Sequence, residues 1–376
     1  MDQKDKTPVF VHSLFRSGST YIFNAFRRSG AGYWPYQEPL NETLIDNAQR
    51  EGGFQGGPET ANEYLRHPEL DKSHTYEFHV AADEVVRRFR KNFPYQLFFS
   101  QSQEELIEVV EYLRVLQERA QGRPVFQCCR TTGRVGPLKD ALGGRHLFLW
   151  RNPWDQWWSY KSDTYFEARN LFIAAAKDAP AVIRILRDEM GFPKLENLSE
   201  EARDIYCESR QVPPGASYRI FYALWCLAMM DARPLCDLDI SIDALTVSGE
   251  YREERLAKLK ELGIEGLDFS DCKVPRPLYG EADANFFKAQ EDVVHQLFLR
   301  CGRSPGIIDQ LSKLSAARLA RVVDTSLEEN ATVRDAMRAR SLALQATATA
   351  AALQSDLFDA RKKIRSNGAA QAAVRH

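Results

Sequence analysis

The sequence lacks an apolar run long enough to cross a membrane, and its first apolar segment begins as early as Val9. That start leaves no room for the charged region, apolar core and cleavage site of a secretory signal. Paired Cys-x-x-Cys motifs are also missing, and the seven cysteines include the adjacent Cys128 and Cys129 in an apolar segment. An odd number of cysteines indicates reduced thiols rather than a disulfide framework. We therefore expect a cytoplasmic protein with no transmembrane segment.

Metal-binding patterns and excess charge are equally scarce. No His-Glu-x-x-His occurs, so we expect no metal. The net charge of −2 and the pI near 6.4 give no basis for binding nucleic acid through bulk charge. A site for an anionic small molecule must gather its arginines locally, and the candidates are Arg16, Arg130, Arg134 and Arg151. The 376 residues, 44% of them hydrophobic, are enough to bury a substantial core.

Residues 9–26 have the pattern of a buried strand, a polar turn and a helix. Such a turn presents backbone N–H groups to an anion, with the positive end of the helix dipole behind them. It departs from the nucleotide-hydrolase pattern Gly-x-x-x-x-Gly-Lys-Ser/Thr, because Gly18 is followed by Ser19 and the cation, Arg16, precedes the glycine. Thr20 is still able to bind Mg²⁺, so a phosphotransferase that uses ATP and Mg²⁺ remains an alternative.

A second strand and helix follow the same plan. Residues 146–150 predict a buried strand, and Arg151 stands at its carboxyl end. Asn152 is a favourable N-cap and Pro153 suits the first helical position, so a helix is expected from Pro153 onward. Ser159 lies about two turns along that helix. The guanidinium of Arg151 and the hydroxyl of Ser159 can together hold a second phosphate.

In these two motifs the sequence resembles the sulfotransferases that use 3′-phosphoadenosine 5′-phosphosulfate (PAPS), over about residues 7–303. In that family a Lys/Arg-Ser-Gly-Thr/Ser-Thr turn holds the 5′-phosphosulfate. An Arg-Asn/Asp-Pro motif, with a serine eight positions after the arginine, holds the 3′-phosphate. Golgi members carry an amino-terminal anchor, and its absence suggests a soluble enzyme of the bacterial type. The resemblance implies a PAPS site made of Arg16, Ser17, Gly18, Ser19, Thr20, Tyr21, Arg151 and Ser159.

The resemblance also assigns the candidate catalytic residues. The segment Glu38-Pro-Leu is similar to a motif of carbohydrate sulfotransferases, in which the acidic residue is proposed to deprotonate the acceptor. We therefore expect Glu38 as the base, with a solvated loop carboxylate as the alternative reading and His74 or His79 as substitutes. Arg16 is expected to offset charge that develops during transfer, and Arg130 to lie near the sulfuryl group.

Strand and helix signals alternate along the chain, which predicts an α/β fold with a parallel sheet. Ser102 and Glu105 form a capping box before an apolar helical stripe, and residues 125–129 predict a strand that ends at Arg130. Ligands of such sheets bind at the carboxyl ends of the strands. We expect Arg134 to form a salt bridge and Lys139 to be a solvated charge. The expected fold is a P-loop-like three-layer arrangement, in which helices flank a central parallel sheet. Further elements are expected at 218–230 (buried helix), 237–242 (strand), 252–262 and 283–301 (helices).

From Ser304 the composition shifts towards alanine-rich, helix-forming sequence. Leu353, Leu357, Ala360 and Ile364 stand at alternating steps of four and three residues, as in a short coiled coil. We expect a sulfotransferase-like α/β domain over residues 1–303. The helical extension over residues 304–376 is expected to serve self-association or docking.

The expected activity is in-line transfer of a sulfuryl group from PAPS to an acceptor hydroxyl. The acceptor is a small molecule or a glycan, and the Glu38-Pro-Leu segment favours a carbohydrate. Two alternatives belong to other classes: a phosphotransferase that uses ATP and Mg²⁺, and an inactive interaction protein that binds the adenosine bisphosphate without transferring anything.

Overall fold

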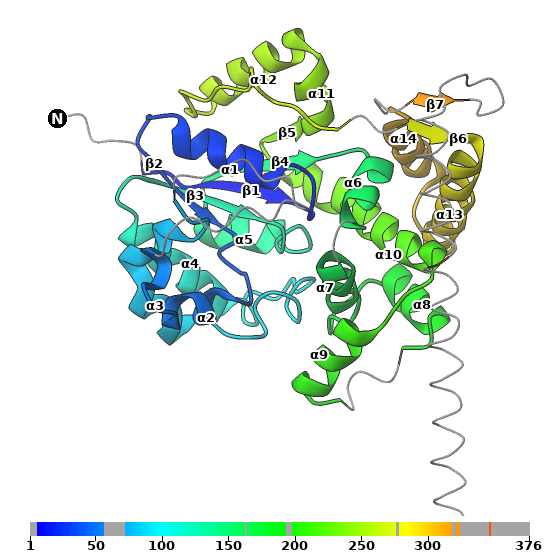
Figure 1. Ribbon diagram of the computed structural model, residues 1–376, viewed down its shortest axis with the longest axis horizontal. Coiled ribbons are helices and arrows are strands. Elements are labelled where there is room, and N and C mark those ends of the chain that lie inside the picture. Colours follow the sequence, from blue (N-terminus) through cyan, green and yellow to red (C-terminus); the bar gives the residue numbers. More distant parts are fainter. Residues whose placement is uncertain are drawn as a thin grey trace, which may run out of the picture.

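The computed structural model describes residues 6–55, 72–161, 164–192, 198–275, 278–317, 321–323 and 346. Its centre is a sheet of five parallel strands in the order β2-β3-β1-β4-β5 (Figure 1). The α/β class and the parallel sheet that the sequence predicts are thereby confirmed. The strands are β1 Val9–Ser13, β2 Tyr33–Gln37, β3 Arg123–Cys128, β4 Arg145–Trp150 and β5 Leu238–Ser241.

Helices cover both faces of the sheet, which gives three layers (Figure 1). Side chains alternate along each strand, so Phe10 and Phe126 pack with α4 whereas Val9 and Val125 pack with α1. One face carries α1 Ser19–Arg28, α11 Ile242–Val247 and α12 Gly249–Glu261. The other face carries α3 Ala82–Arg88, α4 Ile107–Arg119 and α5 Val135–Leu142, with α2 Leu44–Gln49 and the 3₁₀ turns Gly53–Gln55 and Tyr76–Ala81 beside α3.

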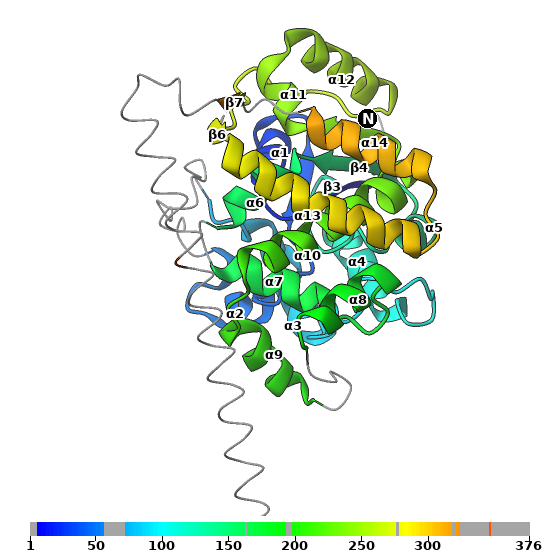
Figure 2. The ribbon, with the colours of Figure 1, turned by 90° about the vertical axis from the view of Figure 1, so that its right-hand side faces the viewer.

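A group of helices lies beside the sheet and is organised around α10 Pro214–Leu227 (Figures 1 and 2). Nearly every residue of α10 is buried, as its apolar sequence predicts, and the helix continues into a π-helical turn, Ala228–Ala232, and a 3₁₀ turn, Arg233–Leu235. Within the described ranges, no helix is both long and apolar enough to span a bilayer. The surrounding helices are α6 Pro153–Tyr160, α7 Thr164–Ala174, α8 Ala181–Glu189, α9 Glu200–Ser209 and α13 Glu281–Arg300.

The first helix beyond residue 303 packs into this body. Helix α14 Pro305–Ala316 contributes Ile308 and Leu311 to the same apolar cluster as α10, and Asn152 donates a hydrogen bond to the Ser315 carbonyl at 2.8 Å. Strand β7 Arg321–Val323 then pairs in parallel with β6 Leu278–Gly280. Residues 304–317 and 321–323 are therefore joined to the α/β part. The expected coiled coil at 353–364 lies outside the described residues.

All seven cysteines lie in the described part of the chain, and they are free thiols, five of them buried. Cys128 and Cys129 follow the apolar core of β3, and burial raises the pKa of both thiols. A thiol with a raised pKa is mostly protonated near neutral pH, so these two cysteines behave as core side chains.

Candidate functional site

The first motif forms the strand, turn and helix that its sequence predicts. Strand β1 ends at Ser13 and α1 begins at Ser19, with Gly18 as its N-cap. Gly18 has φ 88°, and a Cβ there would stand 2.6 Å from Cγ1 of Ile242, so only glycine fits without a shift. No side chain of the described residues caps α1, and the first N–H groups of a helix have no partner within it. This end of α1 therefore presents donors and a positive dipole to an anion.

Several side chains of this motif are engaged by the fold. The Ser17 hydroxyl donates to the Leu14 carbonyl at 2.6 Å, inside the turn. The Tyr21 hydroxyl donates to Asp271 at 2.7 Å, beside the far end of α1. Thr20 accepts a hydrogen bond from Gln37 at 3.2 Å. The hydroxyls of Ser17 and Tyr21 thus have internal partners, which leaves their backbone N–H groups for the expected anion site.

Arg16 joins the first motif to the second. Its backbone has φ 64°, and its Nε donates a hydrogen bond of 2.8 Å to the Ser159 hydroxyl, with the guanidinium 5.0 Å from the ring centre of Phe166. Ser159 is carried there by α6, which starts where the sequence predicts, with Asn152 as N-cap and Pro153 in the first turn. Residues 143 positions apart in the chain are therefore in direct contact at the turn.

Arg151, the other half of the second motif, is buried at the end of β4. Its Nε lies 3.4 Å from Asp243 and its Nη2 donates to the Pro275 carbonyl at 3.3 Å. Burial raises the pKa of Asp243, against the opposing effect of Arg151. Asp243 is adjacent to Ile242, the residue against Gly18, so Arg151 borders the turn from the α11 side. An anion bound to Arg151 has to compete with this carboxylate.

Glu38 directly follows β2 and also has a left-handed backbone, with φ 50°. Its Oε1 accepts hydrogen bonds from the Gln127 amide and the Cys129 N–H, both at 3.0 Å. Its Oε2 accepts from Arg130 at 2.6 Å and from the same Cys129 N–H at 3.1 Å. A carboxylate offers about four lone-pair positions, and all of them are engaged here. The alternative of a solvated loop carboxylate does not fit this environment, because the Glu38 side chain is only 14% exposed.

Arg130 sits between two carboxylates. It is 1% exposed, and it contacts Glu42 at 2.7 Å and the Tyr165 hydroxyl at 3.0 Å in addition to Glu38. Arg169 approaches Glu42 from α7, at 3.2 Å. Burial alone would raise the pKa of Glu42, but Arg130 and Arg169 outweigh burial and hold this pKa at about 2. Two guanidinium groups are thus matched by two carboxylates beside the Arg16 turn.

The two candidate histidines lie in different places. His74 bonds through Nδ1 to the Gln37 side chain at 2.5 Å, and Gln37 in turn donates to Thr20, so His74 lies two hydrogen bonds from the start of α1. His79 bonds to the Tyr76 carbonyl and packs against Trp34 on the outer side of β2. The structure therefore connects His74, and not His79, to the candidate site.

Arg134 and Lys139 differ from the sequence expectation. Arg134 is buried and donates to the backbone carbonyls of Leu97, Phe93 and Arg130, so it stabilises loops instead of forming a salt bridge. Lys139 forms an ion pair with Asp237 at 2.8 Å, so it is not simply a solvated charge.

The groups that sequence reasoning missed are Asp243, Glu42, Tyr165 and Arg169. Glu42 stands four positions after Glu38, which is the one local signal among them. The other three come from α7 and α11, and only the tertiary fold brings them to the site. Among the described residues, no group of three or more His, Cys, Asp or Glu side chains is placed to hold a metal ion. Comparisons with family models, curated proteins and solved structures found no match.

Proposed function

We propose that this chain transfers a sulfuryl group from PAPS to an acceptor hydroxyl, with a carbohydrate favoured by the Glu38-Pro-Leu segment. The observation that carries the proposal is the 2.8 Å hydrogen bond from Arg16 to Ser159, since it joins the two motifs at the uncapped start of α1. A nucleotide with anionic groups at two positions fits a site that has one arginine at the turn and another, Arg151, at the neighbouring strand end.

The proposed roles follow from what each group already does in the fold. The N–H groups at the start of α1 bind anionic oxygens, and the donor supplies an activated sulfuryl group there. Arg16 stabilises developing charge electrostatically, because an arginine with a pKa above about 12 is a poor proton donor. Arg130 holds the Glu38 carboxylate in place, since its own charge is matched by Glu38 and Glu42.

Arg16→Ala tests the proposal in a transfer assay with labelled PAPS and panels of glycans, phenols and small alcohols. Turnover should fall by roughly 10²–10³, as when a charge-stabilising donor is removed elsewhere. Arg87→Ala, which removes an exposed arginine paired with Glu84, is the matched control and should leave turnover unchanged. Unchanged turnover in Arg16→Ala would remove Arg16 from the mechanism. Tight binding of ATP and Mg²⁺ in place of adenosine 3′,5′-bisphosphate would favour a phosphotransferase, and bisphosphate binding without any transfer would favour an interaction protein.

The proposed base is Glu38, and it has to release one of its four hydrogen bonds to accept a proton. Glu38→Gln should abolish turnover while bisphosphate affinity persists, because the nucleotide contacts lie on the Arg16 turn. His74→Asn is the parallel variant. Retained turnover in Glu38→Gln, together with lost turnover in His74→Asn, would transfer the role of the base to His74.

A further inference from the structure

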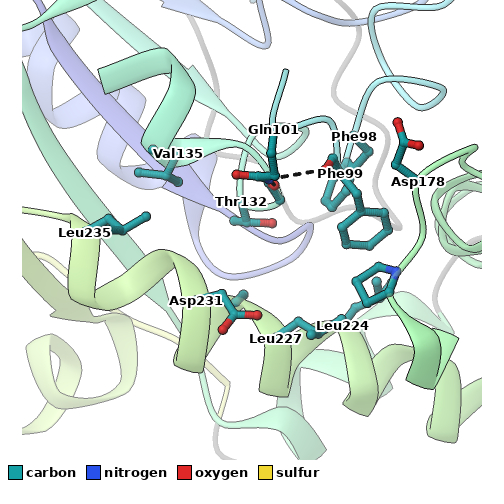
Figure 3. A pocket seen from close by; sticks show the side chains of 14 residues that line it. Phe98, Phe99, Gln101, Thr132, Val135, Asp178, Leu224, Leu227, Asp231 and Leu235 are labelled. Carbon is teal, nitrogen blue, oxygen red and sulfur yellow. Dashed lines mark hydrogen bonds between the residues drawn. The ribbon is translucent and has the colours of Figure 1, made fainter. Parts of the chain in front are cut away.

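A cavity of about 340 Å³ lies behind the loop that carries Arg130, and Figure 3 shows it from close by. Its lining combines apolar and polar groups and comes from four segments of the chain that are distant in sequence. This volume is within the range of about 300–1,000 Å³ found for sites that bind small molecules. The apolar walls are Phe98, Phe99, Val135, Leu224 and Leu227.

One polar side chain points into the apolar interior. Thr132 is 5% exposed, and Figure 3 shows its hydroxyl directed towards the space between Phe99 and Leu227. The preceding residue, Thr131, bonds to His12 at 2.7 Å, but the Thr132 hydroxyl has no hydrogen-bond partner within the part of the chain that is described. The Thr132 hydroxyl oxygen is not among the fully buried atoms that lack a partner, so it is open to the cavity and available to form a hydrogen bond with a ligand there.

The mouth of the cavity is acidic. Asp178 and Asp231 lie on opposite sides of it in Figure 3, both exposed, and the 14 described residues that line it include no Lys, Arg or His. Asp231 also pairs with Arg303 at 2.8 Å outside the cavity. Arg303 offsets part of the charge of Asp231, so Asp178 is the main negative charge at the opening, and it favours a cationic group over an anionic one.

The wall that carries Asp231 has unusual backbone geometry. Helix α10 gives way at Ala228 to a π-helical turn that runs to Ala232. π-Helical turns are rare and often occur at functional sites. Here the turn supplies both Ala228, which lines the cavity, and Asp231 at its mouth.

We propose that this cavity binds a small apolar molecule that carries a protonated amine. The apolar part contacts the phenylalanine and leucine walls, a polar atom pairs with the Thr132 hydroxyl, and the ammonium lies between Asp178 and Asp231. This site is separate from the Arg16 turn, and its occupation does not depend on sulfuryl transfer.

Three phenols of similar size and different charge test the proposal, since each carries a hydroxyl for Thr132: tyramine, tyrosol and 3-(4-hydroxyphenyl)propanoate. Each is titrated into the full-length chain by calorimetry near neutral pH. The amine should bind more tightly than the alcohol, and the alcohol more tightly than the carboxylate. Equal affinity for all three, or tightest binding of the carboxylate, would overturn the proposal.

Variants place the binding in this cavity. Thr132→Val should weaken amine binding roughly two- to tenfold without lowering the stability of the free protein, and Thr132→Ser should restore it. Asp178→Asn and Asp231→Asn should each weaken the amine roughly two- to fivefold and leave the alcohol unaffected. Asp309→Asn, which removes an exposed carboxylate paired with Lys313 on α14, is the matched control. Amine binding that none of the three cavity positions alters would contradict the assignment.

Discussion

At the scale of single residues, strain is concentrated at the candidate site. Arg16 and Glu38 are the two non-glycine residues with positive φ in the described chain. Such conformations cost about 1–3 kcal/mol each and persist where the surroundings fix them, often at functional sites. Here Ser159 fixes the side chain of Arg16, and four hydrogen bonds fix that of Glu38.

Tyr160, next to Ser159 on α6, has a buried hydroxyl without a hydrogen-bond partner among the described residues. Burial raises the pKa of Tyr160, so the hydroxyl is neutral. Tyr160→Phe should therefore leave the free energy of unfolding unchanged or raise it. Tyr222→Phe is the matched control, since it removes a 2.9 Å bond to His295 and should cost about 1 kcal/mol. Urea unfolding measures both, and an equal loss in the two variants would show that Tyr160 has a partner after all.

The sequence predicts the residue types of the site better than their contacts. Arg16, Ser159 and Glu38 were identifiable from motifs, and the structure brings Arg16 and Ser159 together. Their neighbours were not identifiable, because Arg169 and Asp243 reach the site through packing of helices that are far away in the chain. Arg130 shows the difference most clearly, since no local pattern indicates that two carboxylates surround it.

At the scale of elements, buried strands and helices were predictable wherever their apolar pattern was strong. The expected strands at 146–150 and 237–242 correspond to β4 and β5, and the expected helix at 283–301 to α13. The helix expected from the Ser102 capping box begins only at Ile107, because residues 103–106 form a turn. The packing of helix α14 was not predictable, because its composition alone does not show that its apolar stripe contacts the body.

Strands β1 and β4 share a row of buried histidines. His146 donates through Nε2 to the Gly143 carbonyl, so in the neutral ring its Nδ1 accepts from His12, which lies 2.9 Å away. Nδ1 of His12 lies 2.7 Å from the Thr131 hydroxyl, which can give its one proton either to this nitrogen or to the Cys128 carbonyl at 3.2 Å. With both rings neutral, every ring nitrogen of the pair has a partner. Burial lowers the pKa of both rings, and the pKa of His12 is lowered further because a proton on His12 would be repelled by Lys139 and by any charge on His146.

This row predicts how stability depends on pH. The unfolded chain takes up protons below the ordinary histidine pKa of 6.5, whereas the folded row takes them up only at lower pH, so the free energy of unfolding should fall as the pH drops below 6.5. Each histidine contributes a slope of up to about 1.4 kcal/mol per pH unit. His12→Gln should lower the number of protons taken up on unfolding by about one and reduce the slope accordingly. Urea unfolding at several pH values measures this slope. A flat profile in the parent protein would contradict this account of the row.

At the scale of the whole molecule, the parallel sheet brings together the two motifs that we propose to bind anions. Strands β1 and β4 are adjacent, so the turn after β1 and helix α6 lie at the same edge of the sheet, and Arg16 contacts Ser159 in the last turn of α6. The central claim is that one nucleotide contacts both, with its 5′ group at the Arg16 turn and its 3′-phosphate at Arg151.

The most direct test compares two ligands on one variant. Arg151→Gln is titrated with adenosine 3′,5′-bisphosphate and with adenosine 5′-phosphate, which lacks the 3′-phosphate. Our account predicts that the variant binds the bisphosphate about 10- to 100-fold more weakly than the parent protein, since a charged hydrogen bond is lost, while its affinity for the monophosphate is unchanged. An equal loss for both ligands, or no loss for either, would contradict it.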